Sequence, residues 1–212
     1  MIDIRCFTVN AFAENTYLVF DDLGNGLVFD PGFMDASESD AFDAFVQANN
    51  INLRQCLQTH CHIDHILGLH HINQKYGLKT RMHPNEISVF ESGRNVSALY
   101  GLPYKEGMYN DEYLANGMNL LIGEIKCSVH FTPGHSPGSV CFYFYEQHML
   151  IAGDLIFKGS VGRTDLPGGD HNELINSVRN EVFVLPDHTR IYSGHGEPTN
   201  VGHEKMYNPF FN

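Results

Sequence analysis

The hexapeptide at residues 60–65, His-Cys-His-Ile-Asp-His, constrains this chain most, because four of its side chains can bind a metal. The residues before it predict a short strand at 56–59. Apolar positions after it recur at helical spacing as far as Gly77, a residue typical of helix C-caps. Packing gives no reason to gather imidazoles where a strand turns into a helix, since buried polar groups destabilise the fold unless they are partnered. We therefore expect a metal site there.

The spacing within the hexapeptide suggests two ions. His60 and His62 are two residues apart, so they share a face of an extended segment. Asp64 and His65 lie where the chain enters the helix and can face a neighbouring point from another direction. One hexapeptide could thus serve two metals about 3.5–4 Å apart. Cys61 alternates away from both histidines, which favours a packing role.

Three later segments repeat the pattern of an apolar β-run that stops at a glycine beside a metal-capable residue. They hold His135, Asp154 and His195. A glycine beside a ligand lets the backbone turn sharply and allows close approach to a metal. Imidazole and carboxylate together suit zinc, iron or manganese.

Hydrophobic patterning predicts an α/β chain with strand-rich segments followed by strand–helix alternation. Two mixed sheets packed together, with helices outside, accommodate this order. Residues 84–118 are irregular and polar, and we expect a long surface excursion with one helix. The expected strands are 2–9, 15–20, 27–29, 56–59, 78–82, 120–122, 125–131, 139–145, 149–152 and 190–193, and the other expected helices are 39–49, 66–76 and 171–183.

Composition narrows the function class. A length of 212 residues without a compositional boundary predicts one domain. The 13 Lys and Arg against 25 Asp and Glu give a net charge of −12, which argues against nucleic-acid and membrane-surface partners. The five cysteines include no CxxC pair, and neither a secretory signal nor a long apolar run is present. These features predict a cytoplasmic location.

The motifs THCHIDH, TPGHSPGS, AGDLIF and SGHGEPT together resemble the metallo-β-lactamase superfamily, spaced as in its glyoxalase II branch. The resemblance extends from residue 29 to residue 199. It implies a four-layer αββα sandwich with a dinuclear metal site at one edge, formed by a single domain over residues 1–212. It also implies a hydrolase of the hydroxyacylglutathione hydrolase type. The glutathione-binding helical domain of full-length glyoxalase II is not expected.

The same resemblance implies a ligand set for two divalent ions, most simply zinc, with iron or manganese as alternatives. Asp154 would bridge the two ions, because a carboxylate has two oxygens. Asp30, at the end of a strand, matches a residue that orients a ligand histidine. The first ion would be held by His60, His62 and His135, and the second by Asp64, His65 and His195.

The implied reaction is hydrolysis of a small-molecule thioester, such as an S-acylglutathione. Two ions sharing a water lower its pKa toward about 7, and the bridging hydroxide beside Asp154 would attack the acyl carbonyl. Asp64 would orient this nucleophile or accept its proton. Arg163, in a loop shared with such hydrolases, could bind a substrate carboxylate or anchor its own loop. Glu197 departs from the GHGPxT pattern, and the acidic charge does not favour an anionic substrate.

Two alternatives stay open. A persulfide dioxygenase of this superfamily holds one iron through residues matching His60, His135 and Asp154. The loop containing Arg163 favours assignment to that enzyme, whereas His195 within Gly-His-Gly argues against the assignment. A non-catalytic metal-binding module is the other alternative, although structural metal sites tend to be closed cages of four ligands.

Overall fold

The first half of the chain builds a five-stranded sheet. The computed structural model describes residues 1–212, and the strands of this sheet follow one another in chain order. The first three are antiparallel, whereas β3, β4 and β5 run parallel, so the expected βαβ unit is confirmed. The strands are β1 (Ile2–Val9), β2 (Glu14–Asp21), β3 (Asn25–Phe29), β4 (Asn52–Leu57) and β5 (Thr80–Arg81).

The second half builds a six-stranded sheet in the order β13-β12-β9-β8-β7-β6 and a separate hairpin, β10–β11. Strands β6 to β9 form the expected antiparallel meander, and β12 adds parallel to β9. The bounds are β6 (Asn119–Ile122), β7 (Ile125–Phe131), β8 (Val140–Phe144), β9 (Met149–Gly153), β10 (Ile156–Phe157), β11 (Ser160–Val161), β12 (Arg190–Ser193) and β13 (Thr199–Asn200).

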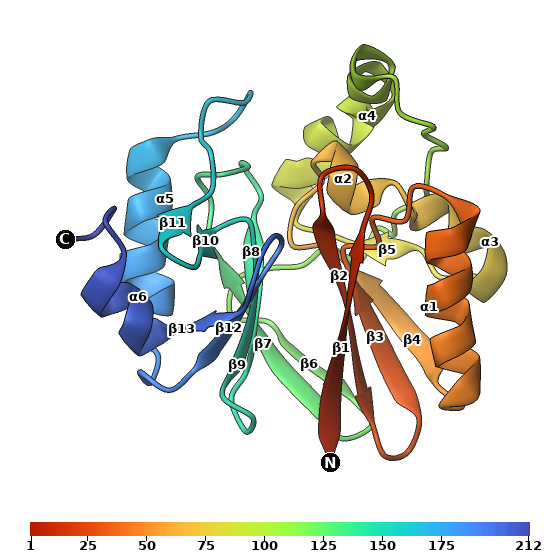
Figure 1. The fold of residues 1–212 in the computed structure, drawn as a ribbon, viewed down its shortest axis with the longest axis horizontal. Coiled ribbons are helices and arrows are strands. Elements are labelled where there is room, and N and C mark those ends of the chain that lie inside the picture. Colours follow the sequence, from red (N-terminus) through yellow and green to blue (C-terminus); the bar gives the residue numbers. More distant parts are fainter.

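Helices cover the outer face of each sheet. In Figure 1, α1 and α3 lie outside the first sheet, and α5 and α6 lie outside the second. No helix combines the length and apolar character needed to cross a membrane. The helices are α1 (Ala36–Ala48), α2 (Ile63–Ile66), α3 (Leu69–Tyr76), α4 (Ile87–Tyr100), α5 (His171–Ser177) and α6 (Val201–Tyr207), with a 3₁₀ turn at Pro84–Glu86 and a π turn at Val178–Val182.

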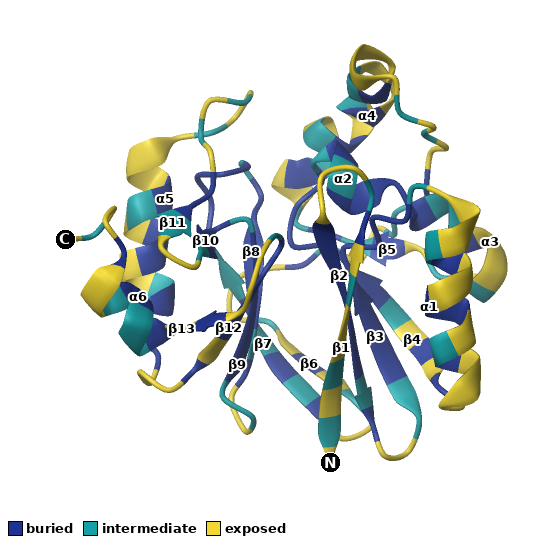
Figure 2. Cartoon of the chain, in the orientation of Figure 1, coloured by how far each residue is buried: buried dark blue, intermediate teal, exposed yellow.

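Strand alternation separates three cores. On β2, Tyr17 and Val19 pack into the core between the sheets, whereas Leu18 packs into the core beneath α1. On β9, Ile151 faces the central core and Leu150 faces α5 and α6. Successive side chains of a strand point to opposite faces, so inner strands such as β2 and β3 are buried on both sides and dark blue in Figure 2, whereas the edge strand β1 is mostly exposed or intermediate. Three cores separate four layers, and the αββα sandwich is confirmed.

Several elements differ from expectation. α1 begins at Ala36, three residues early, because Asp35 caps it by accepting from two backbone N–H groups. The helix expected at 66–76 is divided into α2 and α3, and β4 ends before residues 58–59. The excursion at 84–118 contains one helix, α4, as expected. β10, β11, β13 and α6 are short elements that the sequence did not predict.

Candidate metal centre

The candidate ligands come together because each follows the carboxyl end of a strand. β3 and β4 run parallel, so Asp30 and the hexapeptide leave the first sheet at one edge. In the second sheet β7, β9 and β12 share a direction, and the segments after them carry the remaining candidates. These two edges adjoin, so ligands far apart in sequence converge. The segments after β7, β9 and β12 hold His135, Asp154 and His195.

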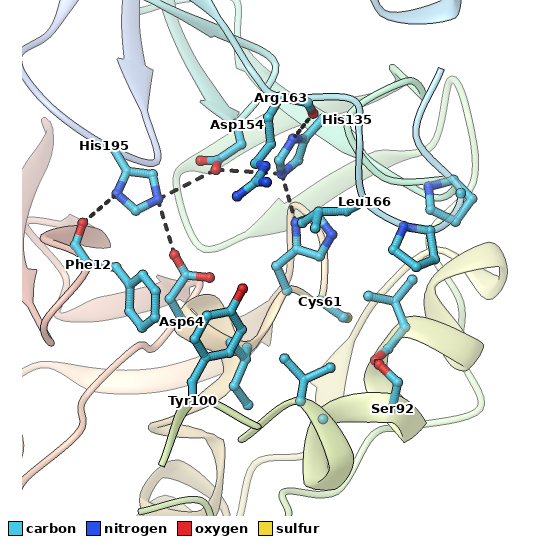
Figure 3. A pocket seen from close by; sticks show the side chains of 18 of the residues that line it. Phe12, Cys61, Asp64, Ser92, Tyr100, His135, Asp154, Arg163, Leu166 and His195 are labelled. Carbon is cyan, nitrogen blue, oxygen red and sulfur yellow. Dashed lines mark hydrogen bonds and ion pairs between the residues drawn. The ribbon is translucent and has the colours of Figure 1, made fainter. Parts of the chain in front are cut away.

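The first donor cluster consists of His60, His62 and His135, whose ligand atoms lie within 4.8 Å of one another. His135, labelled in Figure 3, has its Nε2 at 2.8 Å from His62 Nδ1 and at 3.2 Å from His60 Nε2. Two imidazole nitrogens bound to one tetrahedral zinc at about 2.0–2.1 Å stand about 3.3 Å apart. The cluster therefore fits one metal ion of this size.

The second cluster consists of Asp64, His65 and His195. Asp64 Oδ2 lies 3.2 Å from His195 Nε2 and 3.7 Å from His65 Nε2. His65 is fully buried, whereas His195 is partly open to solvent. A carboxylate and two imidazoles are again a donor set for a divalent transition metal.

Asp154 lies between the two clusters. Its Oδ1 is 3.4 Å from His65 Nε2, and its Oδ2 is 3.5 Å from His135 Nε2 and 3.4 Å from His195 Nε2. Asp154 Oδ1 and His65 Nε2 are both buried without a hydrogen-bond partner. Buried polar atoms are nearly always satisfied, so these two unpartnered atoms fit ligands of a metal ion. Gly194 permits the approach, since a Cβ there would stand 2.2 Å from Asp154 Oδ1.

Oxygen atoms outside the clusters fix the orientation of the imidazoles. His135 Nδ1 donates to the Arg163 carbonyl at 2.7 Å, and His195 Nδ1 donates to the Phe12 carbonyl at 3.1 Å. Each of these bonds leaves Nε2 directed into the cluster. Such outer partners set the tautomer that a metal needs.

Asp30 plays the corresponding part for His65, whose Nδ1 lies 3.2 Å from Asp30 Oδ2. Both carboxylate oxygens of Asp30 also accept from Thr59, at 2.7 Å from its backbone N–H and 2.5 Å from its hydroxyl. The backbone of Asp30 has a φ of 48°, a conformation unfavourable for a non-glycine residue. Asp30 lies close to His60 and His65 and could serve as a ligand with them, but its bonds to Thr59 suit an orienting role better.

The two clusters differ in charge. In the first cluster, burial lowers the pKa of His60 and His135, and it lowers the pKa of His62 to about 3. These imidazoles are therefore neutral, the form that binds a metal.

In the second cluster, burial opposes protonation of the imidazoles, but neighbouring carboxylates outweigh it. Contacts with Asp154 and Asp64 raise the pKa of His195 to about 10, and the charges of the same two carboxylates raise the pKa of His65. Burial also opposes ionisation of Asp64 and Asp154, yet the charge of His65 holds both pKa values low. The two carboxylates are thus paired with protonated imidazoles, and a metal ion that binds here would displace these protons, because only neutral imidazole ligates a metal.

Glu86, which the sequence did not single out, links the loops that carry the first cluster. Its buried carboxylate accepts from the backbone N–H of Cys61 at 2.7 Å, the Ser136 hydroxyl at 2.5 Å and the backbone N–H of Gly138 at 2.6 Å. Cys61 stands between two candidate ligands, and Ser136 follows a third. No local pattern marks Glu86, because its role depends on two distant loops.

Glu14 is a second buried carboxyl that the sequence did not indicate. Its Oε2 accepts from the Thr16 hydroxyl at 2.8 Å, and its Oε1 lies 3.7 Å from His65 Nδ1. Burial raises the pKa of Glu14 well above its usual value. Glu14 and Asp30 thus support the same histidine from behind.

A cavity of about 810 Å³ opens over both clusters, and its lining includes His62, Asp64 and Asp154. This volume suits a small molecule. Arg163 also lines the cavity, and its guanidinium pairs with Asp165 through two contacts of 2.7 Å.

Known proteins resemble the whole chain. The model of the metallo-beta-lactamase superfamily matches residues 9–195. Hydroxyacylglutathione hydrolase GloC of Haemophilus influenzae is 32% identical, covering 100% of this chain and 99% of the relative. BLEG-1, described as a B3 metallo-beta-lactamase, superposes with a TM-score of 0.91 at 33% identity, covering 99% and 100% of the two chains. TTHA1623 in a di-iron-bound form superposes with a TM-score of 0.87 at 34% identity, covering 97% and 99%.

The family match spans most of the chain, and the cited relatives and solved structures match it over nearly their whole length. The chain belongs to the metallo-β-lactamase superfamily, as a metal-dependent hydrolase.

Proposed function

We propose that this protein hydrolyses thioesters with two metal ions. The observation that carries the proposal is the position of Asp154, whose carboxylate lies within 3.5 Å of imidazoles from both donor clusters. His60, His62 and His135 would hold one ion, and Asp64, His65 and His195 the other. The resemblance to a relative named hydroxyacylglutathione hydrolase favours a thioester over other acyl substrates.

Zinc is the proposed metal, although the same donors accept iron or manganese. When bound, the two ions would lower the pKa of a water to about 7 and polarise the substrate carbonyl.

The chain's own residues then position water and move protons. Asp64 lines the cavity with its side chain 13% exposed, so a water in the cavity can reach its carboxylate. Asp64 would accept a proton from this water as the water oxygen forms a bond to the acyl carbon. The carbon–sulfur bond then breaks, and the departing sulfur takes up the proton. The products are a carboxylic acid and a thiol.

The rigid surroundings of the imidazoles support this role. His195 is held through Nδ1 by the Phe12 carbonyl, and His65 is held by Asp30. Preorganised donors need not rearrange during the reaction, which is a large part of enzymatic rate enhancement.

Elemental analysis of freshly purified protein, paired with a thioester assay, tests the proposal. We expect two divalent ions per chain and release of thiol from at least one acyl thioester, tested with S-lactoylglutathione and with simple acyl thioesters. One iron per chain with oxygen uptake on glutathione persulfide would contradict it. Faster hydrolysis of a β-lactam than of any thioester would also contradict it, and would instead place the chain functionally with BLEG-1.

A further inference from the structure

The cavity over the metal clusters has two walls with many apolar side chains. Helix α4 contributes Val89 and Val96, and the hairpin β10–β11 with the loop after it contributes Phe157, Val161 and Leu166. Leu166 is one of the lining side chains labelled in Figure 3. Apolar walls bind apolar groups, because burial removes hydrocarbon from water.

Two aromatic rings extend this surface beside the second cluster. Phe12, in the turn between β1 and β2, meets Tyr100 at the end of α4 edge to face, with ring centroids 5.9 Å apart. Both rings line the cavity together with Asp64 (Figure 3). The polar groups of the α4 wall are the hydroxyls of Ser88, Ser92 and Tyr100, which are uncharged at neutral pH.

Arg163 is the only lysine or arginine that lines the cavity. Asp165 lies two residues away and already binds the guanidinium through both carboxylate oxygens. An incoming carboxylate would have to compete with this tethered partner, whose effective concentration is high. The positive charge of Arg163 is therefore already balanced by Asp165.

Glutathione needs cationic or hydrogen-bonding partners for its carboxylates, and these walls offer few. Its two carboxylates stand at the ends of the tripeptide, away from the sulfur, so the walls of a cavity must supply their partners. A carboxylate that moves from water into a cavity loses its hydration, and this is unfavourable unless a cation or a hydrogen-bond donor replaces the water. With Arg163 paired and the rest of the α4 and hairpin walls uncharged, both carboxylates would be poorly matched.

Resting on the thioester hydrolysis proposed above, we propose that this cavity selects thioesters whose acyl and thiol groups are uncharged and apolar. Thioesters of glutathione are then poor substrates.

Matched substrates test this selection. The hexanoyl thioesters of N-acetylcysteamine and of glutathione share an acyl group and differ in the charge of the thiol. We expect kcat/KM to be at least tenfold higher for the uncharged thioester. Acetyl-N-acetylcysteamine should also be hydrolysed at least tenfold less efficiently than the hexanoyl compound, because it leaves the apolar walls unfilled. A glutathione thioester that is hydrolysed equally well or better would overturn the proposal.

Measurements of binding test the preference of the cavity independently of thioester hydrolysis. The thioethers S-hexyl-N-acetylcysteamine and S-hexylglutathione cannot be hydrolysed, so calorimetry with the metal-loaded protein measures cavity preference alone. We expect a Kd at least tenfold lower for the uncharged thioether. If that preference appears but no thioester is cleaved, the thioester function fails while the cavity preference stands. Equal affinities would overturn the preference, whether or not thioesters are cleaved.

Asp165→Asn tests whether the pairing of Arg163 with Asp165 disfavours glutathione thioesters. Freeing Arg163 should raise kcat/KM for the glutathione thioester several-fold and leave the N-acetylcysteamine thioester nearly unchanged. Glu146→Gln is the matched control, because it removes the same charge from an exposed pair with Lys126 outside the cavity. A glutathione thioester that gains nothing from Asp165→Asn would show that the pairing of Arg163 does not set the preference.

Val96→Thr tests the apolar wall with little change in volume. The added hydroxyl should lower kcat/KM several-fold for hexanoyl-N-acetylcysteamine and little for the acetyl compound. Val184→Thr, at an exposed position outside the cavity, is its control. Equal effects on both acyl groups would show that the wall does not hold the acyl chain.

Discussion

Asp154 joins the two donor clusters, since its oxygens approach His65, His195 and His135 within 3.5 Å. Asp30 also lies close to His60 and His65, but its only ion-pair contact is with His65, so Asp154 alone makes such contacts with both clusters. Its burial makes the arrangement depend on a cation, because an unpaired buried carboxylate is strongly unfavourable.

Asp154→Ala should therefore lose both metal ions and nearly all turnover. His62→Ala removes a donor from one cluster only, so it should lose about one ion per chain. Elemental analysis after gel filtration measures the stoichiometry, and circular dichroism checks the fold. Two ions retained in Asp154→Ala would show that this residue does not bridge.

Glu86→Gln should weaken metal binding at the first cluster by roughly 10-fold to 100-fold, the range seen for outer-shell partners. Glu86 accepts three hydrogen bonds, and a glutamine amide group would turn donors toward the N–H groups of Cys61 or Gly138. The loops that carry His62 and His135 would then separate.

Titration with a competing chelator measures the affinity of each ion. Glu91→Gln, an exposed position on α4, is the control and should leave both affinities unchanged. Loss of the second ion before the first in Glu86→Gln would count against a role for Glu86 at the first cluster.

At the scale of elements, a single carboxylate ties α1 to α3. Asp43 accepts from Lys75 Nζ at 2.6 Å, from Tyr76 Oη at 2.5 Å and from His71 Nε2 at 3.1 Å. Burial alone would raise the pKa of Asp43, but these hydrogen bonds outweigh it and hold the pKa below its usual 3.8. The folded state therefore favours the charged form.

Asp43→Asn should lower the free energy of unfolding by about 2 kcal/mol at pH 7, as expected for hydrogen bonds to a charged group. A lowered folded pKa gives stability that is fully present above the unfolded pKa and is lost as pH falls through the folded pKa. The difference between wild type and variant should thus persist near pH 5 and shrink below pH 3.8.

Urea unfolding of metal-free protein at several pH values measures this difference. Asp40→Asn changes an exposed carboxylate of the same helix and serves as the control. A difference that stays constant down to about pH 3 would mean that the ionised form of Asp43 is not what joins the helices.

An element could be predicted when a local sequence pattern determines it, and could not when its tertiary contacts determine it. Strands such as β7 and β12 were predicted because their apolar runs are local, and the candidate ligands because their motifs are contiguous. α6 was missed because it is short and its ends are fixed by Glu204, whose carboxylate accepts from Thr199 and Asn208. Glu86 was missed for a different reason, because two distant loops define its role.

At the scale of the whole molecule, the metal clusters join the two halves of the sandwich. The hexapeptide follows β4 of the first sheet, whereas His135, Asp154 and His195 follow strands of the second. Asp154 approaches His65 across this boundary at 3.4 Å. A metal held by both halves therefore binds the folded state and not the unfolded chain.

Removal of the metals should lower the Tm. A ligand at a thousand times its Kd stabilises the folded state by about 4 kcal/mol. For a domain of 150–250 residues, that corresponds to a loss of roughly 8–16 °C in Tm on chelation. Calorimetry of metal-free and reloaded protein measures the shift. Asp154→Ala, in which neither cluster is complete, should show almost no difference between the two conditions. A wild-type Tm that chelation leaves unchanged would mean that the ions do not hold the two sheets together, because any ion bound only by the folded state must stabilise it.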